Sequence, residues 1–94
     1  MGLQLFDLTG QRALVTGSSQ GIGFALAQGL AAAGAQVVLN GRDPARLAAA
    51  AARIPGAATL AFDATRHDEV RAAIDGFEAA TGPIGILVNN AGMP

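Results

Sequence analysis

One stretch of eleven residues decides the fold of this chain: Ala13-Leu14-Val15-Thr16-Gly17-Ser18-Ser19-Gln20-Gly21-Ile22-Gly23. An apolar run leads into a loop with three glycines, and an apolar-periodic segment starts at Ile22. Glycines at this spacing, between a strand and a helix, let the backbone approach a phosphate closely. The stretch therefore predicts a strand, a nucleotide-binding loop and a helix in succession.

Each glycine has a separate role under this interpretation. Gly17 allows a tight turn, Gly21 removes a Cβ where a diphosphate approaches, and Gly23 lets the helix pack close to the sheet. We expect the two serines to offer hydroxyl donors and the first helical amides to face the anion. The candidate phosphate-binding residues are Gly17, Ser18, Ser19, Gln20, Gly21, Ile22 and Gly23. An ordinary glycine-rich turn is the alternative, because a glycine pattern alone is a weak signal.

Four apolar runs alternate with three helix-like stretches along the chain. The runs are Arg12–Thr16, Gln36–Asn40, Ala58–Phe62 and Ile84–Asn89. Because they are apolar throughout, they are typical of parallel strands covered on both faces. Strands separated by helices imply right-handed βαβ units. The pattern therefore predicts an α/β fold with a parallel sheet.

The first helix is expected to bury one apolar stripe. Its members, at helical spacing, are Ile22, Ala25, Leu26, Gly29, Leu30 and Ala33. Gly34 is expected to end the helix. Phe24 lies off the stripe, which predicts a contact with a part of the fold or a partner that this chain lacks.

Capping residues mark the starts of the other two helices. Asp43 is expected to be the N-cap of the second helix, with Pro44 at its first position. Thr65 is expected to be the N-cap of the third, with Asp68 three residues on as in a capping box. The buried stripe of the third helix is predicted to consist of Val70, Ala73, Ile74 and Phe77.

Composition excludes several classes of function. The net charge is −1, all six basic residues are Arg, and they form no run, so nucleic acid and anionic membranes are poor partners. The chain contains no Cys, which excludes disulfides, thiolate catalysis and cysteine metal sites. Residues 1–10 carry no positive side chain, and no uninterrupted apolar run approaches the length of about 18 that a membrane span needs. We expect a cytoplasmic protein.

The residues after the second run indicate which dinucleotide would bind. Ligands of such sheets lie beyond the carboxyl ends of the strands. A carboxylate there would accept hydrogen bonds from the ribose 2′-OH of NAD, whereas Gly41 leaves the position uncharged and Arg42 can bond a phosphate. The pattern favours NADP(H) over NAD. The alternative is a surface ion pair of Arg42 with Asp43 or Asp75.

Polar residues also follow the third and fourth runs. Asp63 is a candidate acceptor for the adenine amino group, with Ala64 against the ring edge, and helix capping beside Thr65 is equally open. Asn90 is a candidate to hold a backbone carbonyl or to touch the cofactor ribose, and alternatively to bridge neighbouring strands. All of these residues fall at the edge of the predicted sheet where a ligand would bind.

Together these motifs resemble the N-terminal part of the short-chain dehydrogenases/reductases. Thr16-Gly17-x-x-x-Gly21-x-Gly23 is similar to the family's cofactor glycine motif, and Asn89-Asn90-Ala91-Gly92 to its motif after the fourth strand. Asp63 stands where the family has its adenine-contacting acid. Residues 38–43 resemble NADP-preferring members similar to gluconate 5-dehydrogenase or 3-oxoacyl-carrier-protein reductase. The resemblance adds Ala91 and Gly92 to the candidate cofactor-binding residues.

The resemblance implies a Rossmann-like, doubly wound parallel sheet with strand order 3-2-1-4. Residues 1–94 would form only its βαβαβαβ part, truncated after the fourth strand. The family implies hydride transfer between NADP (NAD less so) and a small-molecule carbonyl or alcohol, in a homo-oligomer. Its catalytic set is a Ser, a Tyr-x-x-x-Lys and an Asn, but this chain has no Tyr, no Lys and serines only at 18 and 19. We therefore expect no catalytic residue and no metal site in these 94 residues.

Three functions are compatible with the sequence. The chain is expected to be the cofactor-binding portion of an NADP(H)-dependent oxidoreductase, inactive on its own. A non-catalytic dinucleotide-binding module is the second interpretation. The third is an interaction fragment that pairs with another chain through the exposed edge of the fourth strand.

Overall fold

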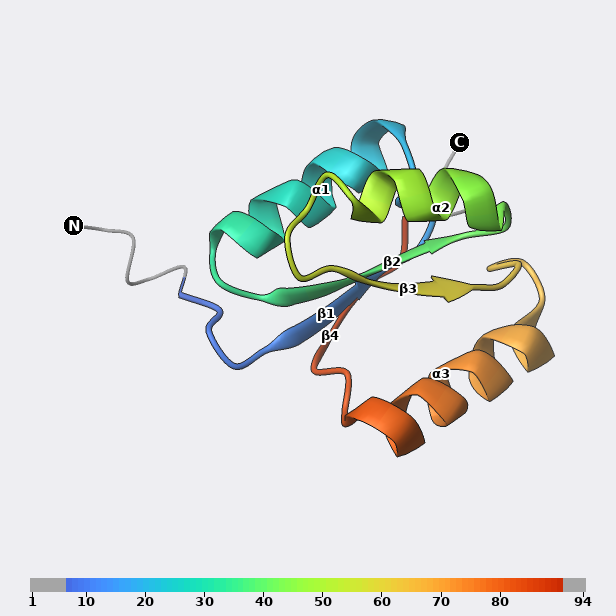
Figure 1. The fold of residues 1–94 in the computed structure, drawn as a ribbon. Coiled ribbons are helices and arrows are strands. Elements are labelled where there is room, and N and C mark those ends of the chain that lie inside the picture. Colours follow the sequence, from blue (N-terminus) through green and yellow to red (C-terminus); the bar gives the residue numbers. More distant parts are fainter. Residues whose placement is uncertain (1–6, 91–94) are drawn as a thin grey trace.

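Strands and helices alternate along the chain, as Figure 1 shows for the computed structural model. The structure describes residues 7–90. In chain order, its elements are β1 (Arg12–Val15), α1 (Gly21–Ala32), β2 (Gln36–Gly41), α2 (Pro44–Ala51), β3 (Ala58–Ala61), α3 (His67–Thr81) and β4 (Ile86–Val88). Within these described residues, no helix combines the length and the apolar character needed to cross a membrane.

The four strands form one parallel sheet in the order β3-β2-β1-β4. Leu14 in the central strand β1 pairs with Val38 of β2 on one side and with Leu87 of β4 on the other. Helices α1 and α2 cover one face of the sheet, and α3 covers the other (Figure 1). The predicted α/β, Rossmann-like parallel sheet and its strand order 3-2-1-4 are therefore confirmed. Because the strands all run the same way, their carboxyl ends lie at one edge of the sheet.

Alternate residues of the central strands fill two separate cores. Val15 belongs to the core under α1 and α2, together with Phe24. Leu14 and Val38 belong to the core under α3, together with Phe62. Successive side chains of a strand lie on opposite faces, so a sheet covered on both faces needs apolar residues at every position. This explains why the apolar runs of the sequence do not alternate with polar residues.

The strands β1, β2 and β3 agree with the expected runs to within one residue at each end. β4 is shorter than the expected run 84–89, because it begins at Ile86 and ends at Val88. The backbone amide of Ile84 donates to the carboxylate of Glu78, 2.7 Å away. The Ile84 amide thus bonds a side chain of α3 and not the neighbouring strand.

Helix α1 is rotated relative to the predicted stripe, so the expectation was wrong for Ile22, Ala25, Leu26 and Gly29, although Leu30 packs against the core. Its buried residues are Gly23, Phe24 and Ala27, whereas Ile22 is 75% and Leu26 43% exposed. Phe24 is buried in the core, and the guanidinium of Arg53 lies 4.5 Å from its ring centroid. The predicted contact of Phe24 with a part of the fold or a partner that this chain lacks is therefore not needed. The helix is apolar on most sides, so its periodicity could not select the buried face. The close approach that Gly23 permits selects it instead.

The helix ends follow the predictions in two cases and depart from them in one. Gly34, with φ +103°, follows the end of α1 as predicted, and Asp43 caps α2 by accepting from the amides of Ala45 (3.0 Å) and Arg46 (3.3 Å). Thr65 is not the N-cap of α3; that position is Arg66, which has no side-chain capping bond. The Thr65 hydroxyl donates to Asp63 instead, 2.7 Å away.

The buried stripe predicted for α3 is confirmed. The described side chains of α3 that pack against the core of Leu14, Val38 and Phe62 are those of Val70, Ala73, Ile74 and Phe77. All four are partly buried, because α3 alone covers this face of the sheet in the described part of the chain.

Candidate functional site

A pocket of about 460 Å³ opens at the carboxyl ends of β1, β2 and β3. Its lining residues are Gly17, Ser19, Gln20, Asn40, Gly41, Arg42, Asp43, Arg46, Phe62, Asp63, Ala64 and Thr65. Six of the residues predicted to bind the cofactor are among them: Gly17, Ser19, Gln20, Arg42, Asp63 and Ala64. The fold thus brings together, from three loops, residues that lie up to 47 positions apart in the sequence (17 to 64).

The glycine-rich loop supports a close approach to the N-terminus of α1. Gly17 and Gly21 have φ values of +61° and +64°, the left-handed region that favours glycine. A Cβ built on Gly21 would meet no heavy atom within 4 Å, so the space beside it is open. The first amides of a helix have no partner within the helix, and its dipole favours a negative charge there. These features leave open space and favourable electrostatics for an anion at the start of α1.

Gly23 has a different physical role, which the structure makes explicit. A Cβ at this position would overlap the carbonyl oxygen of Gly17 and lie 2.7 Å from Nδ2 of Asn90. The side chain of Asn90 reaches the same carbonyl, donating from Nδ2 over 3.2 Å, and its backbone amide donates to the Thr16 hydroxyl over 2.9 Å. Asn90 therefore holds a backbone carbonyl, one of the roles proposed for it. Ala91 and Gly92 lie outside the described residues.

Ser18 does not offer its hydroxyl to a ligand, which corrects the expectation from the sequence. The side chain is fully buried. Its Oγ donates to the carbonyl of Val15 (2.6 Å) and accepts from the amide of Asn40 (2.9 Å), while its own amide donates to the Asn40 carbonyl (2.8 Å). Ser18 thus fastens the loop to β2, and Ser19 is the serine that lines the pocket.

Asn40 is a site residue that the sequence reasoning missed. It lies near the end of β2, is 1% exposed, and lines the pocket. The available signal was a single amide side chain in the otherwise apolar run Val37-Val38-Leu39-Asn40. A buried polar side chain needs hydrogen-bond partners, so such a residue points to a specific network rather than to packing alone.

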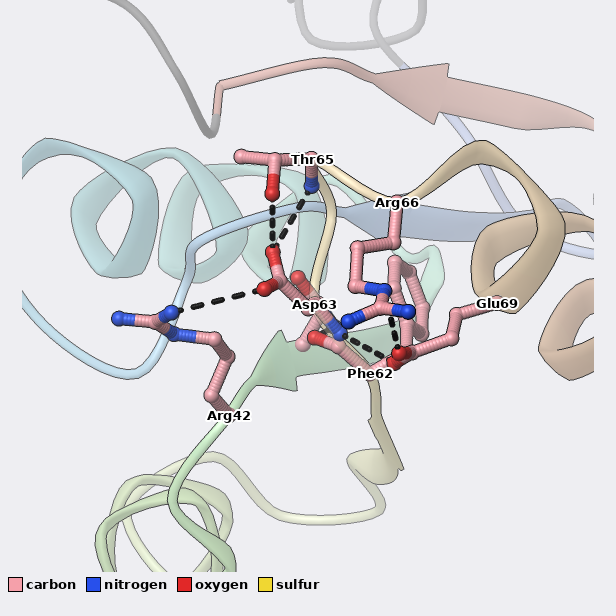
Figure 2. A network of polar contacts seen from close by, with 7 residues as sticks. Arg42, Phe62, Asp63, Thr65, Arg66 and Glu69 are labelled. Carbon is pink, nitrogen blue, oxygen red and sulfur yellow. Dashed lines mark hydrogen bonds and ion pairs between the residues drawn. The ribbon is translucent and has the colours of Figure 1, made fainter.

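The Arg42 guanidinium lies at the mouth of the pocket, where it faces Asp63 (Figure 2). Arg42 Nη1 is 3.5 Å from Oδ2 of Asp63, and the Arg42 side chain is 77% exposed. Neither Asp43 nor Asp75, the partners considered from the sequence, makes this ion pair. Arg46, also at the pocket, donates from Nη1 to Oε1 of Gln20 over 3.4 Å. Two guanidinium groups therefore border the same opening.

Asp63 is held as a carboxylate by the turn that follows β3. Its Oδ1 accepts from the Thr65 hydroxyl (2.7 Å) and the Thr65 amide (3.0 Å), as Figure 2 shows. These two bonds, in that order, lower the pKa of the Asp63 carboxyl below its ordinary value; desolvation opposes them and Arg42 adds to them. Glu69, itself paired with Arg66, accepts from the Asp63 amide (3.3 Å). Asp63 therefore caps a turn rather than helix α3.

Comparison with known proteins agrees with this geometry. The family described as short chain dehydrogenase matches residues 11–94. A strand–glycine loop–helix unit and a parallel sheet of order 3-2-1-4 define the class as an α/β nucleotide-binding fold. The chain belongs to the short-chain dehydrogenase family.

Several proteins with described activities are similar to this chain. It is 50% identical over 93 residues to the gluconate 5-dehydrogenase of Gluconobacter oxydans, covering 95% of this chain and 36% of that protein. It is 44% identical over 93 residues to the 5-keto-D-gluconate 5-reductase of Escherichia coli K12, covering 95% and 37%. The chain thus spans little more than a third of the length of these relatives.

Solved structures show the same likeness. A gluconate 5-dehydrogenase from Burkholderia cenocepacia, in complex with NADP and tartrate, superposes with a TM-score of 0.91 at 50% identity, over 99% of this chain and 38% of that one. The L-sorbose reductase of Gluconobacter frateurii, complexed with NADPH and L-sorbose, gives a TM-score of 0.81 at 38% identity, over 93% and 36%. In both of these solved structures, the fold seen here forms one part of a longer chain.

Proposed function

We propose that residues 1–94 are the cofactor-binding first part of an NADP(H)-dependent oxidoreductase that interconverts a carbonyl and an alcohol by hydride transfer. The observation that carries this proposal is the pocket that joins the glycine-rich loop to Arg42 and Asp63. Membership of the family supports the reaction class, and the NADP and NADPH complexes of similar proteins support the cofactor.

The proposed binding mode follows from the charges around the pocket. The diphosphate would lie at the N-terminus of α1, over Gly17 and Gly21, where amides and the helix dipole favour an anion. The adenosine would occupy the pocket, with its amino group toward Asp63 and its edge beside Ala64. Its 2′-phosphate would then face Arg42, because a guanidinium bonds a phosphate strongly.

Asp43 is the acid whose charge could oppose binding of a 2′-phosphate at the end of β2. This acid follows Arg42 directly and also lines the pocket. Its Oδ1 accepts from the Ala45 and Arg46 amides at the start of α2, so its charge is partly compensated by the helix N-terminus. Gly41 leaves the end of β2 itself uncharged. The 2′-phosphate would therefore meet two guanidiniums and no unbonded carboxylate on this strand end.

When bound, the nicotinamide would supply or accept the hydride. The residues of this chain would bind and orient the cofactor. The glycine-rich loop would bind its diphosphate, and Arg42 would bind its 2′-phosphate. Asn90 would hold the loop in place through its bond to the Gly17 carbonyl. Because the chain contains no Tyr and no Lys, we propose that the acid/base groups belong to another part of the complete protein. The 94-residue chain alone would then lack turnover.

We further propose a polyhydroxylated sugar acid, or its keto form, as the substrate of the complete protein. The support is the naming of the relatives, of which two act on gluconate or 5-keto-D-gluconate by their descriptions. A homo-oligomer in the cytoplasm is part of the same proposal. The test of substrate is the rate of NADPH oxidation by the complete protein with 5-keto-D-gluconate, compared with simple ketones.

The experiment that tests the cofactor role is a titration of the 94-residue chain and of the complete protein with NADPH and with NADH. Carbonyl reduction is assayed in parallel. We expect tighter binding of NADPH by both, with turnover by the complete protein alone. Turnover by the 94-residue chain would refute the placement of catalytic groups outside it, and equal affinity for the two coenzymes would refute the selectivity.

Pairing through the sheet edge is a second candidate function, favoured by one observation. Strand β4 is at the end of the described sheet, and Leu87 on it is 58% exposed. An exposed apolar edge strand invites pairing with another chain. If this is the function of the 94-residue chain, it will associate with increasing concentration, and Leu87→Lys will suppress the association in analytical ultracentrifugation. A monomer at all concentrations would argue against it.

A further inference from the structure

The side chain of Asn40 is buried between two loops that come from different strands. Oδ1 accepts from the amide of Gly17, 3.0 Å away. Nδ2 donates to two carbonyl oxygens, those of Leu60 at 3.0 Å and Phe62 at 3.2 Å. One amide side chain therefore joins the start of the glycine-rich loop, after β1, to the residues that lead out of β3.

Residues of both segments line the pocket on either side of the end of β2, and we call these two segments its walls. Gly17 begins the wall that faces the proposed diphosphate. Phe62 directly precedes Asp63, which lies in the wall on the proposed adenosine side. Strands β1 and β3 do not pair with each other, because β2 lies between them. In the described sheet, β2 is therefore the only strand that pairs with both, and Asn40 lies near its end.

The chemistry of the position requires an amide on a short stem. One acceptor must face the Gly17 amide while two donors face the carbonyls of Leu60 and Phe62. An ionised Asp offers no donor, and Ser offers a single one. With the amide reversed, its oxygen would face two carbonyl oxygens, so the network permits one orientation. Both N–H donors of the side chain and one of the two lone pairs of its oxygen are thus used. This arrangement defines one geometry.

We propose that Asn40 is a positioning residue that sets the separation of the two pocket walls and thereby the affinity for ligands that bind both at once. The inference rests on the proposed function, because it concerns the adenosine end of NADP(H). The affinity of a ligand that contacts both walls depends on their relative position, whereas the affinity of a ligand that contacts one wall does not. This difference separates positioning from a general contribution to folding.

The test compares two ligands of the complete protein by calorimetry. Adenosine 2′,5′-bisphosphate carries the 5′-phosphate for the glycine-rich loop and the 2′-phosphate for Arg42. Adenosine 2′-monophosphate lacks the 5′-phosphate, so it would contact Arg42 after β2 and the Asp63 wall but not the glycine-rich loop. In Asn40→Ala we expect the affinity for the bisphosphate to fall by about tenfold or more, and that for the monophosphate by less than about threefold.

Ile54→Ala provides the matched control. Ile54 is 4% exposed in the core under α1 and α2, but it does not line the pocket. Its truncation leaves a cavity and lowers stability without touching either wall. We expect the two ligands to change affinity by equal factors in this variant. If Asn40→Ala does not fold, the uncharged variant Asn40→Ser replaces it, because its single hydroxyl cannot reproduce the three hydrogen bonds of the amide; the same split is expected.

The outcomes distinguish the two proposals. If the unsubstituted protein binds neither NADP nor the bisphosphate, the proposed function itself fails. Suppose that the unsubstituted protein binds NADP and the bisphosphate. If the Asn40 variants then lose affinity for the bisphosphate and the monophosphate by equal factors, or lose affinity for neither, the positioning role is overturned while the cofactor role stands. The role of Asn40 is supported if its variants lose affinity mainly for the bisphosphate, while Ile54→Ala changes the affinities for the two ligands by equal factors.

Discussion

Arg42 and Asp63 form an ion pair at the pocket, with Nη1 and Oδ2 3.5 Å apart, although they follow the ends of different strands. The Arg42 side chain is largely exposed, and the carboxylate is also bonded twice by Thr65. An ion pair with one largely exposed partner contributes little to stability. The proposed binding of a phosphate by Arg42 would therefore cost little stability and would leave the two bonds from Thr65 to Asp63 in place.

Arg42→Ala is expected to weaken NADPH binding to the complete protein by about tenfold and to leave NADH binding nearly unchanged. The charge-assisted bonds to the 2′-phosphate are lost, and NADH has no such group. Fluorescence titration of the reduced coenzymes measures both affinities. The NADPH affinity should also become less sensitive to salt, because one charge contact is removed.

Arg66→Ala is the control for this prediction. Arg66 is exposed and ion-paired with Glu69, and it carries the same charge, but it does not line the pocket. We expect no change in the NADPH to NADH affinity ratio. An equal loss in both variants would mean that Arg42 acts only through the net charge of the protein, and an unchanged ratio in Arg42→Ala would remove the 2′-phosphate assignment.

Thr65→Val is expected to raise the pKa of Asp63 toward its ordinary value of 3.8, because it removes the hydroxyl bond that lowers this pKa most. The Thr65 amide bond and the Arg42 charge remain, so the pKa should not rise above that value. Carbon-detected NMR titration of the Asp63 carboxyl provides the measurement. Asp7, whose pKa is lowered in the same way by Thr9, should titrate unchanged and serves as an internal reference.

The sign of the pH dependence follows from the lowered pKa of Asp63. A carboxyl whose pKa is lower in the folded than in the unfolded state stabilises the fold above the unfolded value, and this contribution is lost as the pH falls through the folded value. For Asp63 the contribution is therefore lost as the pH falls from around the ordinary value of 3.8 through the lower folded value. Between pH 5 and 8, coenzyme binding should show no inflection from Asp63. An inflection there that disappears in Asp63→Asn would contradict this.

Gly23→Ala is expected to lower the free energy of unfolding by about 1 to 3 kcal/mol, because the added methyl overlaps backbone and must displace α1 from the loop. The Gly17 carbonyl and the Asn90 side chain are the groups that it meets. Coenzyme affinity should fall as well, since the loop and the helix N-terminus shift relative to one another. Urea denaturation and a coenzyme titration measure the two effects.

Gly29→Ala is the control in the same helix. A Cβ at Gly29 meets nothing within 4 Å. The substitution should stabilise the protein by about 0.5 to 1 kcal/mol, because alanine is the better helix former. If the two variants were equally stable, the close contact at Gly23 would not be what sets the position of α1.

Phe24→Ala is expected to destabilise the protein by about 3 to 5 kcal/mol, the usual cost of truncating a buried aromatic residue. Phe24 is 6% exposed, whereas Ile22, two residues earlier, is 75% exposed. Ile22→Ala should change the stability by no more than about 0.5 kcal/mol. Thermal unfolding of both variants tests which face of α1 is buried, and the reverse ranking would restore the stripe that its periodicity predicts.

Local signals in the sequence were sufficient for the fold class and for several site residues. The unbroken apolar runs predict strands covered on both faces, and Asp43-Pro44 and Gly34 predict where α2 starts and α1 stops. The glycine spacing and Arg42 predict the loop and one border of the pocket. Each of these depends on neighbours within one turn or one strand, so the sequence carries the whole physical cause.

The tertiary structure alone decided the features that depend on distant atoms. The face of α1 that is buried follows from the contact of Gly23 with Gly17 and Asn90, and the Arg42–Asp63 pair follows from the order of the strands. Most hydrogen bonds of the Ser18 and Asn40 side chains go to groups 20 or more residues away in the sequence. No local pattern reveals such partners. Composition and spacing specify which side chains are available, whereas packing determines which of them face each other.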